Sequence, residues 1–412
     1  MRTKFPAAGR SKPEIEAALD AMAQTDADWR NGRVPLFVFG ATPDVADIGR
    51  TAFNRYFTEN ALGGRRAFPS LRRMEDEVVA MALDLFNAPE AAAGAMTSGG
   101  TESIILAVKA ARDHARAQRA DPAHRGNIVL PVSAHPAFDK AALLMDLEIR
   151  RRPVAPDYRA DPATLADAID ADTIMLVGSV PCFPYGVVDP LPALDDLARS
   201  RNVWLHVDAC VGGYFAPFAQ ALGRPIPTFD FALPAVASLS ADLHKFGFTP
   251  KPASTILYRD AARFAAQGFD LDVWPNGRFA TATIVGTRPG GGVAAAWAVL
   301  TYLGRPGYLA LAERLLAMRD AYVAGIESIP GLRMIGNPDL SIIAFGDPAR
   351  DIPTLATFMQ SRGWVPGLIQ HPPGLHMMMS LLHEPARPQY LADLAEAAQR
   401  THPAPTPLQA TY

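Results

Sequence analysis

Short apolar runs rich in β-branched residues alternate with helical stretches along the middle of this 412-residue chain. The runs are NIVLPVSAH, TIMLVGSVP, VWLHVDAC, VASLSAD and STILYRD, and helical patterns at 163–169 and 191–199 separate several of them. Continuous apolar strands interleaved with helices are typical of a mostly parallel sheet with helices on both faces. The sequence therefore predicts an α/β fold around a central, mostly parallel sheet.

The length of the chain and the changes of pattern along it predict more than one structural unit. Residues 1–74 form a mixed amino-terminal segment, with a helix expected at 12–24. Residues 75–305 carry the alternating pattern and form the expected large domain. A long helical pattern with a break near 304–307 then leads into 306–412, where strand and helix patterns predict a smaller carboxy-terminal α/β domain.

The composition argues against a nucleic-acid or membrane partner. The formal charge, 39 basic against 42 acidic residues, is only −3, and neither a signal peptide nor a run of eighteen apolar residues is present. The two cysteines, Cys182 and Cys210, lie in apolar strand-like runs, where a buried free thiol is the favoured state. We therefore expect a soluble protein in the reducing cytoplasm.

A glycine turn, TSGGTES, precedes a helix that runs through His114. Ser98 and Thr101 are helix-capping residue types, while Gly99 and Gly100 let the backbone approach a ligand closely. Because the free amides at a helix start attract phosphate, the turn is a candidate phosphate site. An ordinary helix cap explains the same residues equally well.

Two strand-like runs are followed by residues able to carry chemistry. Asp208 follows VWLHV, and a buried carboxylate there requires a cationic partner such as the protonated ring nitrogen of a pyridoxal cofactor. Lys245 closes the next run, where Phe246 and Phe248 would reduce its hydration and lower its pKa, making the neutral amine available to a carbonyl compound. His244 beside it offers a hydrogen bond to phosphate. Taken singly, a turn-capping Asp and a solvated Lys are the simpler interpretations.

His135 follows the run NIVLPVSA. A lone histidine is more often a packing or surface residue than a functional one. In an open α/β sheet, however, ligands bind beyond the carboxyl ends of the strands, so His135, Asp208 and Lys245 are all expected to face one crevice. No metal-binding constellation is expected, because the histidines are scattered and lack cysteine or carboxylate partners at ligand spacing.

Six blocks occur in a fixed order: SGGTES, SAHPAFDKA, GSVPCFPYGVVDP, HVDACVGG, SADLHKFGFTPK and GTRPGG. In this order they resemble the sphingosine-phosphate lyase branch of the group II pyridoxal-phosphate decarboxylase family, over about residues 50–385. The resemblance implies the type I pyridoxal-phosphate enzyme fold. It also implies a homodimer with active sites shared between its subunits.

The same resemblance implies roles for individual residues. Lys245 would bind pyridoxal 5'-phosphate through its amine, His135 would stack on the cofactor ring, and Asp208 would pair with the ring nitrogen. The phosphate would be held by a further set of residues: Gly100, Thr101, His244, and Thr287 from the partner subunit, where the family usually has serine.

The residues expected to contact the substrate depart from the family pattern. Lys251 matches a lysine that the lyases use near the substrate phosphate, although Pro252 stands where they commonly have glycine. The family block NPLHPD is replaced by NALGGRR, with Gly63 near the histidine position. Arg65 and Arg66 can supply an alternative anion clamp, since guanidinium suits phosphate and carboxylate alike. A solvated loop is an equally good interpretation of these two arginines.

These features predict a carbon-carbon lyase that acts on a small-molecule amine carrying an anionic group. The alternative is an amino-acid decarboxylase of the same fold, because a pyridoxal site labilises whichever bond stands perpendicular to the ring. A third hypothesis is a non-catalytic protein that inherited the fold. Tyr56 and Tyr185 are candidate proton donors, without any geometry from the sequence.

Overall fold

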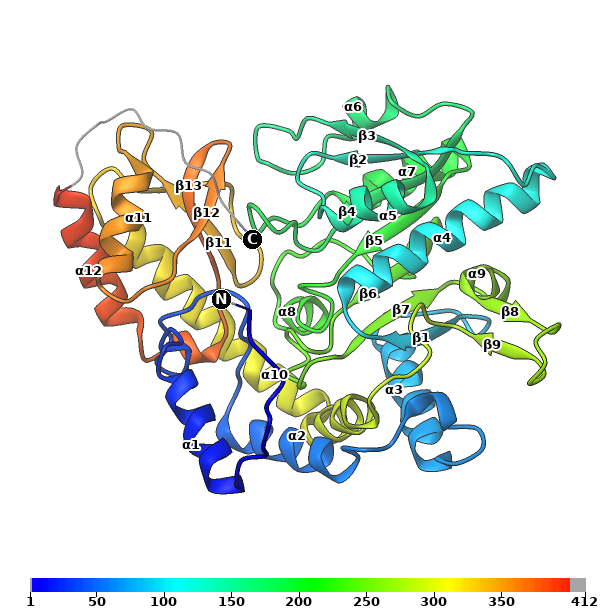
Figure 1. The fold of residues 1–412 in the computed structure, drawn as a ribbon. Coiled ribbons are helices and arrows are strands. Elements are labelled where there is room, and N and C mark those ends of the chain that lie inside the picture. Colours follow the sequence, from blue (N-terminus) through cyan, green and yellow to red (C-terminus); the bar gives the residue numbers. More distant parts are fainter. Residues whose placement is uncertain (1, 401–412) are drawn as a thin grey trace.

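The computed structural model describes residues 2–400, and its main element is a seven-stranded sheet (Figure 1). The strands lie in the order β1-β7-β6-β5-β4-β2-β3. Their bounds are β1 Ala93–Thr97, β2 Asn127–Pro131, β3 Glu148–Arg152, β4 Thr173–Ser179, β5 Trp204–Asp208, β6 Val236–Ala241 and β7 Ser254–Tyr258. Strand β7 is antiparallel to both of its neighbours, β1 and β6, and the pairs from β6 to β3 are parallel. The predicted mostly parallel α/β sheet is confirmed.

Alternate side chains of the strands enter two hydrophobic clusters, one on each face of the sheet. In β2, Ile128 and Leu130 belong to the cluster that contains residues of α4 and α5, whereas Val129 belongs to the other cluster, with Leu165 of α6. The helices of the large unit are α3 Pro69–Leu85, α4 Gly100–Arg119, α5 Ala137–Met145, α6 Pro162–Ala166, α7 Leu191–Arg201, α8 Ala216–Ala221 and α9 Ala261–Gln267. Burial on both faces explains why these strands are continuous apolar runs.

A second sheet of four antiparallel strands follows later in the chain, in the order β10-β11-β13-β12. Its elements are β10 Arg333–Met334, β11 Ile342–Gly346, α11 Ile352–Ser361, β12 Gly367–Gln370, β13 Pro373–Met378 and α12 Arg387–Arg400. We call these elements the small unit. They match the expected carboxy-terminal α/β pattern, while the exact domain limits remain a prediction and 401–412 lie outside the described residues.

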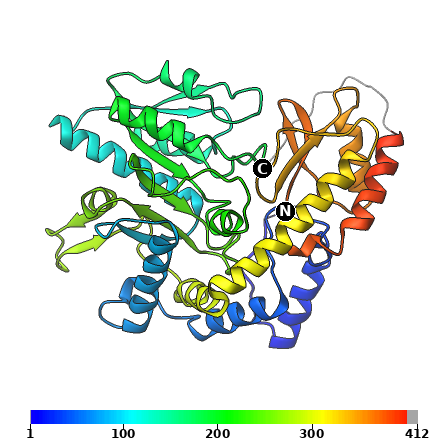
Figure 2. The same ribbon diagram turned by 180° about the vertical axis from the view of Figure 1, so that it is seen from behind.

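One long helix, α10 (Gly290–Glu327), joins the two units. It leaves helical geometry at Gly304, with φ 52° and ψ −175°, inside the break predicted at 304–307. A positive φ is easily reached by glycine and costly for most other residues, which explains why glycine stands at the kink. Figure 2 shows α10 crossing from the large unit to the small one.

The amino-terminal segment packs against both units. Helix α1 (Lys12–Ala23) agrees with the prediction, and α2 (Pro43–Arg55) lies against α10. Between these two helices the chain accepts hydrogen bonds from the small unit, Val365 N to Arg33 O at 2.9 Å and Met378 N to Pro35 O at 2.8 Å. These contacts fix the segment around Phe37 and Phe39 beside the carboxyl edge of the large sheet.

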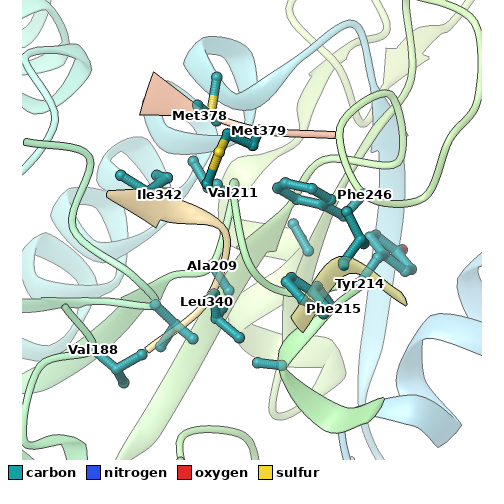
Figure 3. Close-up of a cluster of buried hydrophobic side chains, with 14 of the residues drawn as sticks. Val188, Ala209, Val211, Tyr214, Phe215, Phe246, Leu340, Ile342, Met378 and Met379 are labelled. Atoms are coloured by element: carbon teal, nitrogen blue, oxygen red, sulfur yellow. The ribbon is translucent and has the colours of Figure 1, made fainter. Parts of the chain in front are cut away.

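A shared hydrophobic core lies where the two units meet (Figure 3). Val211, Phe215 and Phe246 of the large unit belong to the same buried cluster as Leu340 and Met379. The two units therefore bury hydrophobic side chains against each other where they meet. The described residues contain no helix that is long and apolar enough to cross a membrane.

Candidate active site

A cavity of about 770 Å³ lies between the carboxyl edge of the large sheet and the small unit. His135, His244, Lys245 and Lys251 line it from one side. Residues 368–371 of the small unit line the opposite side. The cavity thus lies at the sheet edge where α/β proteins bind ligands.

Lys245 lies in the turn that follows β6, four residues beyond the strand end at Ala241. Its Nζ is 3.0 Å from Oδ2 of Asp242. Burial by itself lowers the pKa of Lys245, but the Asp242 carboxylate, together with Cys210 and Asp208, raises it overall. The expectation of a lowered pKa is therefore wrong for the protein without a ligand, because an acidic neighbour outweighs the loss of hydration.

Asp242 is a site residue that the sequence analysis missed. Its side chain is only 2% exposed, and Oδ1 is buried with no hydrogen-bond partner within the described residues. A Cβ added to Gly100 would lie 2.9 Å from Asp242 Oδ2 and 2.8 Å from Cys210 Sγ. The i, i+3 spacing of Asp242 and Lys245 in SADLHK was the available signal, because it brings the two side chains together in a single turn.

Asp208 ends strand β5 and pairs in register with Ser240 of β6. Its Oδ1 accepts a hydrogen bond from Cys210 N at 3.1 Å. Behind it, His206 is fully buried between Ser238 Oγ at 2.8 Å and Ser240 Oγ at 3.2 Å, and burial lowers the pKa of His206 to about 4. A neutral imidazole therefore supports the strand that carries Asp208, whose carboxylate acts on His135 and Lys245 of the cavity lining.

His135 lies four residues beyond the end of β2 and lines the cavity. Its Nδ1 accepts the amide hydrogen of Ala137 at 3.1 Å, so the neutral ring carries its proton on Nε2. Burial lowers the pKa of His135, while Asp208 opposes this shift and Lys245 adds to it. The structure thus brings His135, Asp208 and Lys245 near enough for their charges to influence one another.

The glycine turn before α4 faces His244. A Cβ on Gly99 would lie 3.3 Å from Cε1 of His244. Nδ1 of His244 accepts from Ala253 N at 3.2 Å, which leaves Nε2 as the proton-bearing nitrogen of the neutral ring. Burial lowers the pKa of His244. Thr101 is exposed at the start of the 20-residue helix α4, so free amides and an imidazole N–H are grouped in one place suited to a phosphate.

Lys251 and Tyr185 also line the cavity. Lys251 Nζ donates to Phe37 O at 3.1 Å, and burial followed by repulsion from Lys245 lowers its pKa. The Tyr185 hydroxyl donates to His371 O at 2.6 Å, and burial raises its pKa. Tyr56, the other candidate proton donor, ends helix α2 and does not line this cavity.

Six of the expected site residues are not among those that line this cavity within one chain. Three of them, Gly100, Thr101 and Asp208, come from the neighbouring start of α4 and end of β5. Arg65, Arg66 and Thr287 are exposed and are not among its lining residues. Asn60 Nδ2 donates to Thr287 Oγ1 at 3.3 Å, and Arg288 forms a bidentate ion pair with Glu75 at 2.6 and 3.1 Å. These contacts hold the GTRPGG loop against α3 and the segment that precedes it.

Comparisons with known proteins identify the family. The family model of the pyridoxal-dependent decarboxylase conserved domain matches residues 61–346. This chain belongs to the pyridoxal-dependent decarboxylase family. It is 37% identical to a sphingosine-1-phosphate lyase of Oryza sativa, over 99% of this chain and 76% of the relative, and 41% identical to one of Arabidopsis thaliana, over 83% and 63%. A solved Burkholderia pseudomallei sphingosine-1-phosphate lyase superposes with a TM-score of 0.92 at 38% identity, covering 97% of this chain and 93% of the other.

Membership in this family makes the chain a lyase that uses pyridoxal phosphate, and the residues present fit that cofactor. The Lys245 amine lines the cavity, and the buried Asp208 carboxylate and a helix start with adjacent glycines lie next to its His135 and His244 lining, as an aldehyde, a ring nitrogen and a phosphate require. The unpaired buried oxygen of Asp242 also lies beside the amine. The hypothesis of a non-catalytic protein is thereby excluded. Residues 2–400 contain no group of three or more His, Cys, Asp or Glu able to hold a metal ion.

Proposed function

We propose that this lyase cleaves the carbon-carbon bond next to the amine-bearing carbon of a phosphorylated long-chain amino alcohol. The products would be a long-chain aldehyde and phosphoethanolamine. The proposal is supported by the identities of 35–41% to curated sphingosine-1-phosphate lyases. It also requires a site that accepts both an anion and an apolar chain.

The position of Lys251 is the observation that carries this proposal. The active-site cavity and a second cavity of about 550 Å³ share Phe39, His244 and Lys251. Nζ of Lys251 lies 5.9 Å from the centroid of the Phe39 ring. A phosphate beside Lys251 would stabilise its positive charge, which burial now disfavours, and the apolar walls would accept an alkyl chain.

Apolar side chains surround this junction on several sides. Phe37 and Phe183 line the active-site cavity together with Leu368 and Ile369 of the small unit, and Val45 and Phe53 line the second cavity. A small polar amino acid such as aspartate would leave this apolar surface uncovered. Burying it against a long chain is favourable by about 25 cal/mol for each square ångström.

The cofactor, when bound, supplies an electron sink that stabilises negative charge on the substrate carbon next to the amine. Lys245 would bind it covalently, and Asp208 would keep a proton on its ring nitrogen. His135, neutral with its proton on Nε2, would lie against the ring. The apolar walls would exclude water from the reacting atoms.

A decarboxylase is the second candidate, because one similar protein carries that activity in its name. The chain is 34% identical to a probable L-aspartate decarboxylase of Pyrococcus furiosus, over 88% of this chain and 94% of the relative. The test is product identity with sphingoid-base phosphates and with free amino acids as substrates. Release of aldehyde without carbon dioxide supports the lyase, whereas carbon dioxide from aspartate contradicts it.

We further propose that the active enzyme is a homodimer located in the cytoplasm. Thr287, Arg65 and Arg66 lie outside the Lys245 cavity of their own chain, so they would serve the site of a second copy. Large apolar side chains are exposed next to them: Phe57, Leu62, Ile284 and Val285. Covering such a face is a reason for a chain to dimerise.

Mixed dimers test the shared site. Lys245→Ala and Thr287→Glu chains, each defective alone, would regain activity when combined, because one of the two sites in a mixed dimer would contain both native residues. Light scattering would give the mass of the assembly. A monomeric active enzyme, or the absence of regained activity in proven mixed dimers, contradicts the proposal.

A further inference from the structure

A separate large cavity of about 700 Å³ lies at the opposite edge of the central sheet, away from the two cavities described above. It is formed at the amino ends of β4, β5 and β6, between the last turns of α4 and α7 and the start of α9. In Figure 1 this end of α4 lies away from the small unit. No described residue lines both this cavity and the Lys245 cavity, so it is not an extension of the active site.

The lining of this cavity is cationic. Among the described residues it contains no Asp or Glu but four arginines, Arg119, Arg199, Arg259 and Arg263. Two of them have carboxylate partners just outside the lining: Arg199 pairs with Asp195 at 3.1 Å, and Arg263 pairs with Asp260. The other two arginines make no ion pair within residues 2–400.

The two unpaired arginines are held in place by the backbone. Arg259 Nε donates to Val236 O at 2.7 Å and Nη2 donates to Phe231 O at 2.9 Å, while Arg119 Nη2 donates to Ala171 O. Carbonyl groups orient a guanidinium without neutralising it. Within residues 2–400 the cavity therefore keeps two positive charges without a direct ion pair, since Asp195 and Asp260 act on Arg259 only from beyond ion-pair distance.

The cationic groups also crowd one another. Burial lowers the pKa of Arg259, and the charge of Arg263 lowers it further. The pKa of His114 is lowered in the same way, by burial and then by Arg263. Nε of Arg263 is buried and has no hydrogen-bond partner among the described residues. An anion in the cavity would relieve this repulsion and could accept the unused hydrogen bond.

The walls between the arginines are aromatic or small. The rings of His114 and Trp204 meet edge to face, with centroids 5.6 Å apart, and the Arg263 guanidinium lies 5.6 Å from the Trp204 ring centroid. Ala111 and Ala115 of α4 leave the cavity open. The two guanidinium charges that lack a direct ion pair match the charge of a phosphate monoester, and the volume exceeds what a bare phosphate fills.

We propose that this cavity is a second ligand site, which binds a small organic phosphate monoester at the edge of the sheet remote from the cofactor. The phosphate lies among Arg119, Arg259 and Arg263, and the organic part lies against the rings and the alanines. The proposal is independent of the substrate cleaved at Lys245.

Calorimetric titration of the cofactor-loaded enzyme tests it, with phenyl phosphate and inorganic phosphate as probes. Phenyl phosphate has no amine and cannot react as a substrate. Arg119→Gln, at an exposed position, is expected to weaken phenyl phosphate binding by about ten-fold through loss of a charge-assisted contact. Arg116→Gln removes the same charge from the same helix outside the cavity lining, and it should leave the affinity within about two-fold.

Two further variants locate the ligand. Lys251→Gln alters the other candidate phosphate site and should leave this binding in place. Ala115→Leu narrows the cavity without a charge change and should weaken phenyl phosphate more than inorganic phosphate. The proposed location of the site would be overturned if Arg119→Gln and Arg116→Gln lost phenyl phosphate affinity equally, or if Lys251→Gln lost all binding. If both probes bound with equal affinity and Ala115→Leu left both affinities unchanged, the inference that the cavity binds an organic ester rather than bare phosphate would be overturned.

Discussion

Asp242 Oδ2 lies 3.0 Å from Lys245 Nζ, and this carboxylate raises the pKa of the amine that we propose binds the cofactor. A protonated amine cannot attack the cofactor aldehyde, so the pair would set the pH at which the cofactor attaches. Before the cofactor arrives, the same ion pair neutralises Lys245 inside the protein. Asp242 would therefore control cofactor loading through the charge of Lys245.

Asp242→Asn should shift cofactor attachment to lower pH. Without the carboxylate the pKa of Lys245 falls, and each unit of decrease makes the neutral amine about ten-fold more abundant below that pKa. The measurement is the rate of absorbance change when pyridoxal phosphate is added to cofactor-free protein between pH 6 and 10. Asp47→Asn, at an exposed position, is the control. An unchanged pH midpoint in Asp242→Asn would show that Asp242 does not set the charge of Lys245.

Lys245→Ala should remove covalent cofactor attachment and reduce turnover by about a thousand-fold or more, because in the proposed mechanism the amine carries both the attachment and proton transfers. Thermal unfolding should change little, since the side chain lines a cavity. Lys140→Ala, at an exposed position on α5, is the matched control. Substantial turnover in Lys245→Ala would contradict the assignment.

Asp208→Asn should retain the cofactor but lower turnover by about a hundred-fold or more, because an amide cannot hold a proton on the ring nitrogen. The hydrogen bond from Cys210 N can persist to the amide oxygen, so the loop should remain in place. Steady-state kinetics and the cofactor content of the purified variant separate these two effects. Normal turnover at full cofactor content would exclude the proposed role.

Gly100→Ala should weaken cofactor binding. The added methyl group would lie 2.8 Å from Cys210 Sγ and 2.9 Å from Asp242 Oδ2, so the start of α4 must move. Overpacking of this kind costs about 1–3 kcal/mol, which is at least about five-fold in affinity. Adding Cys210→Ala should restore part of the loss, and Gly9→Ala, where a Cβ meets nothing within 4 Å, is the control. An unaffected dissociation constant would mean that the turn does not hold the phosphate.

Acid should destabilise the protein partly through His376. Burial lowers the pKa of His376 to about 4, whereas the unfolded chain has its ordinary value near 6.5. As the pH falls from 6.5 to 4, the unfolded chain takes up a proton that the folded chain does not, and stability falls by about 3 kcal/mol. Chemical denaturation of His376→Gln should have a shallower pH dependence in this range, with the exposed His371→Gln as control. An equally steep dependence in both variants would rule out this contribution.

The sequence was sufficient to predict the large sheet because its inner strands are buried on both faces and are therefore continuous apolar runs. Strand β3 was missed for the opposite reason: its sequence, EIRRR, is charged and lies at the sheet edge. The hairpin of β8 (Phe269–Leu271) and β9 (Phe279–Thr281) was missed as well, because its short strands are mostly exposed.

The candidate site was only partly predictable. The chain order of strand ends indicated that His135, Asp208 and Lys245 face one crevice, since parallel strands share a carboxyl edge. The pKa of Lys245 was misjudged because its aromatic neighbours were considered and the carboxylate one turn earlier was not. The opposite wall, residues 368–371, comes from a unit more than a hundred residues away in sequence, and local pattern carries no information about such a contact.

The kink at Gly304 has a mechanical consequence for the cleft. Helix α10 packs against α2 and α3 on one side of the kink and against α12 and β10 on the other, so one helix supports both units that form the walls of the cavity. Widening the cavity for a bulky ligand would therefore require α10 to bend. The bend would cost least at Gly304, where the backbone already departs from helical geometry. Ligand entry would then involve a rotation of the small unit about Gly304. A residue with less backbone freedom at position 304 would slow ligand entry and exit without changing any residue of the active site.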